Sequence, residues 1–255
     1  MVKLEGFTSY QDGDDWSPAM SRALQLSRSR RDEVIEIPVG KLRFSGPIAM
    51  NTGTVLMGSG GCPANLGQGT VLMADFDGDF ITWDGRESYR GGGGGLERIV
   101  IAKAPGRSGG NAILLTGSGP SNRCGWFDMN RVLVYAGADA GNFDVGVRID
   151  GTKISVSGSA GVRDVTFRAL MLAGCNRAAM EITNGVHVHG SLQTAIATGR
   201  SGDVIIDGGS QDVQLQGRIY GTLTLRDCRE ITLLGRASAV TKTMQSMDVV
   251  TVGRG

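Results

Sequence analysis

The sequence predicts an all-β chain, a β-solenoid whose first coil is covered by one N-terminal capping α-helix. Three observations indicate this class: a high glycine content, short apolar runs that end at turn residues, and repeats whose period is roughly 33 residues and later roughly 18 residues. Glycine accounts for 41 of the 255 residues and proline for only 6, while 40% of the residues are hydrophobic. Many short strands joined by tight turns need this composition, because glycine adopts turn conformations and the apolar residues still fill a core.

The predicted helix lies within residues 1–33. Asp14, Asp15 or Ser17 provides an N-cap oxygen, and Pro18 suits the first turn, where its missing N–H costs little. An apolar stripe at helical spacing follows, made of Ala19, Met20, Ala23 and Leu24. We expect this helix to cover the open end of a stack of strands, whose free backbone groups would otherwise recruit other chains.

Residues 34–239 are predicted to form the stacked coils. The runs 98–101, 131–134 and 164–167 follow one another at equal steps, and a second set near residues 112, 146 and 179 keeps almost the same period. Shorter steps then relate 186–190 to 204–208, 212–215 to 230–233, and 204–206 to 223–225. Repeats of strands without helices indicate a solenoid, whereas a β-sandwich would not keep one period.

The two ends of the chain give further expectations. Because the helix starts so close to Met1, we expect no anchoring domain before it. Residues 240–255 are predicted to be a C-terminal tail without a folded module. A chain of this kind would reach a particle through another protein.

Residues 1–60 resemble the opening of the pectate-lyase-like superfamily of β-helix proteins, as found in phage tail or head spike proteins. The matching segments are Asp12-Gly13-Asp14-Asp15-Trp16, the helix stripe, the strand 34–37 followed by Pro38-Val39-Gly40, Gly46-Pro47-Ile48, and Leu56-Met57-Gly58-Ser59-Gly60. The resemblance implies a right-handed parallel β-helix of three sheets and a homotrimer. The superfamily includes polysaccharide lyases, hydrolases and plain binders, so the fold alone gives no activity.

Composition argues against several classes of function. Lys and Arg number 26 against 25 Asp and Glu, with no polybasic run, so we expect no nucleic-acid partner. Because the sequence has neither a long apolar run nor an apolar leader, we expect neither membrane insertion nor secretion. The cysteines form no CxxC pair, so we expect neither a disulfide framework nor a metal site, and we expect no cofactor. They are Cys62, Cys124, Cys175 and Cys228.

Candidate catalytic residues come from two acidic groups, because glycoside hydrolysis needs two carboxylates a few ångströms apart. The first group is Asp75, Asp77, Asp79 and Asp84. The second is Asp139, Asp144 and Asp150, of which Asp139 and Asp144 lie in a glycine-rich loop. The alternative interpretation is structural, because Asp before Gly also forms turns by bonding its own backbone. The glycine run 91–95 is predicted to be a flexible loop and not a phosphate-binding loop, because no Lys-Ser or Lys-Thr follows it.

Candidate ligand-binding residues are the aromatic side chains of the middle third, since flat rings stack on sugar faces. They are Trp83, Tyr89, Trp126 and Tyr135. The alternative is that these rings fill coil corners and subunit contacts. His187 and His189 alternate along one strand and should face outward, where no third metal ligand is apparent.

The most direct functional expectation is a structural, receptor-binding spike component on the surface of a virion or phage-like particle. It would be a homotrimer, attach to another particle protein and bind host cell-surface polysaccharide. One alternative is a capsule or lipopolysaccharide depolymerase, a hydrolase or a lyase. Another is a bacterial carbohydrate-processing protein outside any virus.

Overall fold

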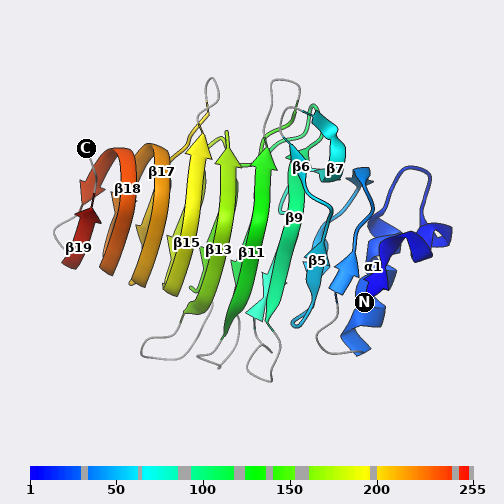
Figure 1. Cartoon of the computed structure of the whole chain (residues 1–255), viewed down its shortest axis with the longest axis horizontal. Helices are drawn as coiled ribbons and strands as arrows, with labels where there is room; N and C mark the ends of the chain where they lie inside the picture. Colours follow the sequence, from blue (N-terminus) through cyan, green and yellow to red (C-terminus); the bar gives the residue numbers. More distant parts are fainter. Residues whose placement is uncertain are drawn as a thin grey trace.

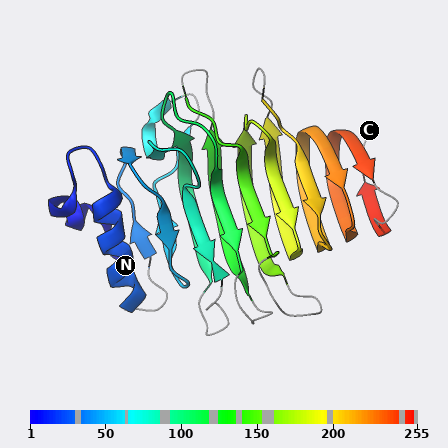
Figure 2. The same cartoon turned by 180° about the vertical axis from the view of Figure 1, so that it is seen from behind.

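The computed structural model describes residues 1–29, 34–62, 65–85, 93–117, 124–135, 140–152, 161–195, 200–242 and 247–252. Strands of successive coils lie side by side along the long axis, with the N-terminal helix at one end and the C-terminus at the other (Figures 1 and 2). Within these ranges every strand pairing is parallel except that between β6 (Gly61–Cys62) and β7 (Asn65–Ala74). This arrangement is a parallel β-helix, as predicted.

Each coil contributes to three faces of the β-helix. The first face contains β1 (Val2–Lys3), β2 (Val34–Glu36), β5 (Val55–Met57), the N-terminal segments of β9 (Gly94–Lys103), β11 (Cys124–Tyr135), β13 (Val162–Ala173), β15 (Gly185–Ala195), β17 (Gln211–Leu225) and β18 (Arg229–Lys242), and finally β19 (Met247–Val252). The second face contains β3 (Gly40–Phe44), β7 and the following segments of β9, β11, β13, β15, β17 and β18. The third contains β4 (Ile48–Met50), β8 (Ile81–Asp84), β10 (Asn111–Thr116), β12 (Val145–Asp150), β14 (Ala178–Thr183), β16 (Val204–Asp207) and the ends of β17 and β18.

Inward side chains stack in rows and form one continuous core. Along the third face a single row in register contains Ile48, Ile81, Ile113, Val147, Met180, Val204 and Leu223, each at most 2% exposed. No single coil could bury these side chains alone, so each coil depends on its neighbours for stability.

The capping helix is confirmed as α1 (Ser17–Ser29), and its predicted apolar stripe is buried. Asp15 caps it, because its Oδ1 accepts hydrogen bonds from Ser17 N at 2.9 Å and from Ser45 N at 3.0 Å. One carboxylate therefore joins the helix start to the end of β3. A 3-10 helix, η1 (Leu4–Tyr10), precedes α1 and was not predicted.

Several predicted repeat steps are confirmed by the strand register. Ile99 pairs with Val132, Ile113 with Val147, and Val147 with Met180, which are the long steps expected from the repeats. The shorter steps near the C-terminus are also confirmed, by the pairs Val213–Ile231 and Val204–Leu223.

Two predicted steps are wrong. Leu133 pairs with Met171, so the run 164–167 is not the equivalent of 131–134, and Val186 pairs with Gln211 and not with Val204. The cause is a pattern that occurs twice in these coils. Arg131 and Asp164 both have positive φ and both precede an apolar strand, but Arg131 begins the second face and Asp164 lies on the first. Sequence spacing cannot separate these two bends.

The β-helix also continues into the segment predicted as a tail. β18 runs to Lys242, and β19 pairs with the N-terminal segment of β18. In the described segments, no helix is long and apolar enough to span a bilayer.

Candidate functional site

Three members of the first predicted acidic group join consecutive coils. Asp75 contacts Arg43 and accepts a hydrogen bond from Arg107 Nε at 3.0 Å. Asp77 Oδ1 accepts from Ser108 N at 2.9 Å, and Asp79 Oδ1 accepts from Asn111 N at 2.9 Å. Asp84 lies apart from them, at the end of β8. Each of the first three carboxylates is therefore engaged by the turn of the next coil.

Asp144 of the second group has the same role in the next coil. Its Oδ2 accepts from Gly110 N at 3.2 Å, and its Oδ1 accepts from Asn176 Nδ2 at 3.3 Å. It thus connects the coil before it to the coil after it. Asp139 lies outside the described residues.

Lys103 lies at the centre of these turns, although nothing in the sequence singled it out. It is 1% exposed; its Nζ donates to the carbonyl oxygens of Gly78, Ser108 and Gly109 and lies 4.6 Å from the centre of the Phe143 ring. Burial lowers the pKa of Lys103, and the nearby carboxylates of Asp77, Asp144 and Asp79 oppose that effect. We call residues 75–79, 103–111 and 140–144 the turn stack.

The Asp75 contacts predict a pH-dependent contribution to stability. The hydrogen bond from Arg107 lowers the pKa of Asp75 from 3.8, and Arg43 lowers it further against the effect of burial. A carboxyl group whose pKa is lower in the folded state stabilises it at pH above the unfolded-state pKa. That contribution disappears as the pH falls through the folded-state pKa. Asp75→Asn should therefore lower the Tm at pH 7. The difference in Tm between this variant and wild type should become smaller below pH 3.8. Asp227→Asn, at an exposed aspartate, is the control; an equal Tm gap at pH 7 and pH 2.5 would contradict the prediction.

The predicted aromatic residues fall in different environments. Trp83 is 1% exposed and packs against Phe127 with ring centres 5.2 Å apart, so the prediction that it binds a surface ligand is wrong. Its position on β8 points the ring into the core. Tyr135 is half-buried against the apolar cluster that includes Leu133. Trp126 is 52% exposed, and Tyr89 lies outside the described residues.

A groove on the outer side of the first face brings together polar residues that the sequence did not indicate. It has a volume of about 300 Å³ and crosses β5, β9, β11 and β13. Gly94 and Gly95 form part of its lining. We call it the first-face groove, and its other lining residues are Val55, Leu96, Glu97, Asp128, Met129, Asn130, Thr166 and Arg168.

The glycines of this groove are strand residues, so the prediction of a flexible loop is wrong for Gly94 and Gly95. Both lie at the start of β9. A Cβ on Gly94 would come within 2.7 Å of Trp83 Nε1 and 3.0 Å of the Phe127 ring. Glycine at this position therefore lets the buried rings pack directly under the groove.

Two carboxylates share this groove on adjacent strands. Asp128 pairs in register with Gly95, and Glu97 pairs with Asn130, so Glu97 and Asp128 are diagonal neighbours. Strand spacing and rise place their Cα atoms about 8 Å apart. The Thr166 hydroxyl donates to Asp128, and Arg98 Nε lies 3.4 Å from Glu97 Oε1. Only the register could have revealed this pair, because the two residues lie a full coil apart in sequence.

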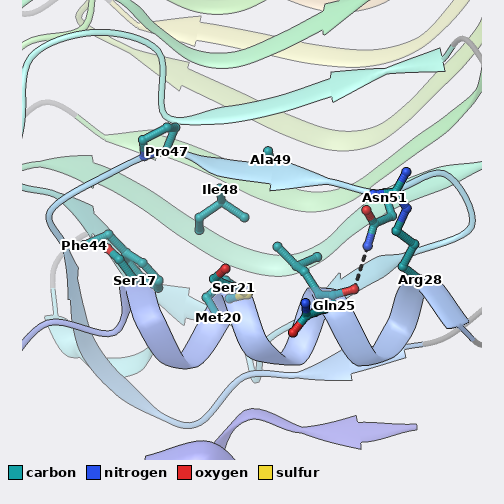
Figure 3. A pocket seen from close by; sticks show the side chains of 11 residues that line it. Ser17, Met20, Ser21, Gln25, Arg28, Phe44, Pro47, Ile48, Ala49 and Asn51 are labelled. Carbon is teal, nitrogen blue, oxygen red and sulfur yellow. Dashed lines mark hydrogen bonds between the residues drawn. The ribbon is translucent and has the colours of Figure 1, made fainter. Parts of the chain in front are cut away.

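A second hollow, of about 380 Å³, lies between α1 and β4 (Figure 3). Asn51 Nδ2 donates to the carbonyl oxygen of Leu24 at 2.7 Å across it, which ties the helix to the third face. Among its described lining residues only Arg28 is charged.

No protein-family model matches the sequence, and no curated protein matches it. Among solved structures, ORF18 of Geobacillus virus E2 aligns with 99% of this chain and 60% of its own, at 11% identity and a TM-score of 0.40. Tailspike protein 3 of bacteriophage CBA120 aligns with 98% of this chain and 57% of its own, at 11% identity and a TM-score of 0.33. The A-module of the Azotobacter vinelandii mannuronan C-5 epimerase AlgE4 aligns with 100% of this chain and 98% of its own, at 10% identity and a TM-score of 0.28.

This chain thus spans about 60% of the Geobacillus virus protein. Its strand register makes it a parallel β-helix, the fold implied by the resemblance of residues 1–60. β-Helices serve phage proteins and carbohydrate-active enzymes alike. At these identities and TM-scores the similar structures do not indicate which of these activities this chain has.

Proposed function

We propose that this chain is a spike component of a phage or phage-like particle that binds host surface polysaccharide through the first-face groove. The observation that carries the proposal is the groove itself, where side chains from three successive coils supply carboxylate, amide, hydroxyl and guanidinium groups. A polysaccharide needs such closely spaced hydrogen-bonding groups, presented on a rigid scaffold.

Trp126 supplies the second element that sugar binding needs. It precedes Asp128 on the same strand, β11, and is 52% exposed, whereas most other large apolar side chains of the described chain are buried. An exposed indole can stack on the face of a sugar ring. Its exposure leaves apolar surface uncovered unless a ligand or partner covers it.

The particle setting belongs to the same proposal. It rests on the resemblance of residues 1–60 to the opening of spike β-helices. In this setting the protein is a homotrimer on the particle surface and attaches to another particle protein.

Binding to purified host surface polysaccharide tests the groove. Trp126→Ala and Arg168→Ala should each weaken the affinity by about tenfold, because hot-spot contacts of this kind contribute about 1.4 kcal/mol or more. Tyr10→Ala and Gln216→Ala remove exposed side chains elsewhere and should leave the affinity unchanged. Wild-type binding by both the Trp126→Ala and the Arg168→Ala variants would place the ligand elsewhere.

One observation favours a second candidate, a depolymerase. Glu97 and Asp128 lie in the same groove, and paired carboxylates in glycosidases are roughly 5 to 9.5 Å apart. In such an enzyme one carboxyl group would protonate the leaving oxygen, while the other would act as nucleophile or activate water.

Release of reducing ends from the same polysaccharide distinguishes the two candidates. If the chain is a hydrolase, Glu97→Gln and Asp128→Asn should each lower the rate at least about a hundredfold, as expected for loss of a general acid or base. Gln216→Ala should cleave at the wild-type rate. Binding without any release of reducing ends would leave the receptor-binding function alone.

A further inference from the structure

The polar row that lines the first-face groove continues beyond it along the β-helix. Asp128 pairs with Thr166, Thr166 with His189, and His189 with Gln214. These side chains all lie on the outer side of the first face and are at least partly exposed. Adjacent strands are about 4.8 Å apart, so the row offers one polar group per coil at that spacing.

Beyond Thr166 the row enters a cluster of two histidines and two aspartates, which we call the acid–histidine cluster. His187 Nδ1 lies 3.1 Å from Asp164 Oδ1, and its Nε2 lies 3.9 Å from Asp212 Oδ2. His189 Nε2 lies 3.1 Å from Asp212 Oδ1. These are the only two histidines of the chain, and the sequence prediction that they face outward is confirmed, because Val186 and Val188 are buried beside them.

Asp212 joins the two histidines of the cluster. Across the described ranges, no three His, Cys, Asp or Glu side chains are arranged to hold a metal ion. Asp212 instead lies between the two imidazole rings, whose centres are 6.4 Å apart. The arrangement is therefore one of alternating acidic and basic groups across β13, β15 and β17.

Protonation changes the charge of this surface. With neutral imidazoles the cluster carries −2, and protonation of both rings brings it to zero. Burial alone would raise the pKa of Asp212, but hydrogen bonds from Gln214 and His189 outweigh burial and lower it. Asp212 therefore stays ionised between pH 5 and 8, the range in which histidine charge changes. Arg163 on β13 and Glu230 on β18 are charged groups of the adjoining strands.

The groove end of the row carries two arginines beside the carboxylates of Glu97 and Asp128. Arg168 lines the groove, and Arg131 begins the second-face segment of β11; both are exposed. Across the described segments, the ion pairs between side chains include neither arginine. Guanidinium groups bind carboxylate and phosphate well, because their donors match the geometry of these anions.

We propose that the acid–histidine cluster extends the first-face groove as a proton-responsive subsite for an anionic polysaccharide. The inference rests on the proposed function and names the substrate class of its site. Arg131 and Arg168 attract the anionic groups at one end of the row. At the other end, the cluster repels them at pH 8 and stops repelling them once both imidazoles are protonated.

The probes are host capsular polysaccharide that carries uronic acids and the same polymer after chemical reduction of its carboxyl groups. Two charges about 8 Å from the ligand in water contribute about 1 kcal/mol, so affinity for the native polymer should rise about fivefold from pH 8.0 to 5.5. The measurement uses low salt, because salt screens exposed charges. In the double variant His187→Gln/His189→Gln the affinity should be the same at both pH values, whereas Gln216→Ala should keep the full rise.

The outcomes separate this inference from the proposed function. Equal affinity of wild type at both pH values, or a preference for the carboxyl-reduced polymer, would overturn the subsite while leaving polysaccharide binding intact. An unchanged pH dependence in the double variant would also overturn it. Failure to bind either polymer at either pH would reject the inference together with the proposed function. Circular dichroism of each variant at both pH values confirms that the coils remain folded.

Discussion

Lys103→Met should destabilise the protein by about 3 kcal/mol, because the carbonyl oxygens of Gly78, Ser108 and Gly109 lose the charged donor that they share, the buried Lys103 ammonium group. Methionine keeps most of the side-chain volume, so the loss reports the ammonium group and not an empty cavity. For a chain of this length the Tm should fall by roughly 6 to 12 °C.

The matched control is Lys41→Met. Lys41 is also a strand residue but is exposed on β3, and surface substitutions of this kind change stability by about 0.5 kcal/mol or less. Thermal unfolding followed by circular dichroism measures both variants. Similar Tm values for the two variants would show that Lys103 does not hold the turn stack together.

Gly110→Ala should be about as damaging, for a steric reason. Gly110 has φ +71°, and a Cβ there would overlap the backbone C and O atoms of Gly78 and come within 2.6 Å of Asp79 N. Those atoms belong to the neighbouring coil, whose backbone is fixed by the Lys103 and Asn111 hydrogen bonds. Relieving the overlap would separate two coils, so we expect a loss of about 3 kcal/mol or more in the free energy of unfolding.

Gly106→Ala separates this overlap from backbone strain. Gly106 lies in the same turn stack with φ +79°, but a Cβ there meets no atom within 4 Å. Gly106→Ala should therefore lower the free energy of unfolding by only roughly 1 kcal/mol, because alanine is strained in a left-handed backbone conformation. Chemical denaturation of both variants measures their free energies of unfolding. Equal losses in the two variants would mean that steric overlap between coils at Gly110 adds nothing to the strain of the backbone.

The acidic residues show how far sequence reasoning reached. For Asp77 and Asp79 the sequence allows two interpretations, catalytic carboxylates or turn formers, and both side chains bond backbone N–H groups of the next coil. Both side chains are thus part of the stacking of the coils, but they bond the next coil and not, as the structural interpretation expects, their own backbone. The partners, Ser108 and Asn111, belong to that next coil, and no local pattern connects them with these carboxylates.

Glu97 and Asp128 show the opposite case. Neither has a distinctive sequence context, and they become neighbours only through the register in which β9 and β11 pair. The same register places Arg98 beside Arg131 at the bend into the second face. Candidate sites of a β-helix follow from such registers, and a register depends on loop lengths that vary from coil to coil.

The apolar pattern and the repeats of the sequence are enough to predict a fold of stacked strands. Alternating apolar residues with glycine turns require strands with one buried side, and a recurring period requires that these strands stack. The sequence also placed α1, because its cap and apolar stripe are local signals. The tertiary structure decided which residues share a row. Asp164 lies on the first face, although the local pattern around it would equally suit the second. The two placements differ in the assumed length of a loop. Only the packing of the whole core distinguishes between them.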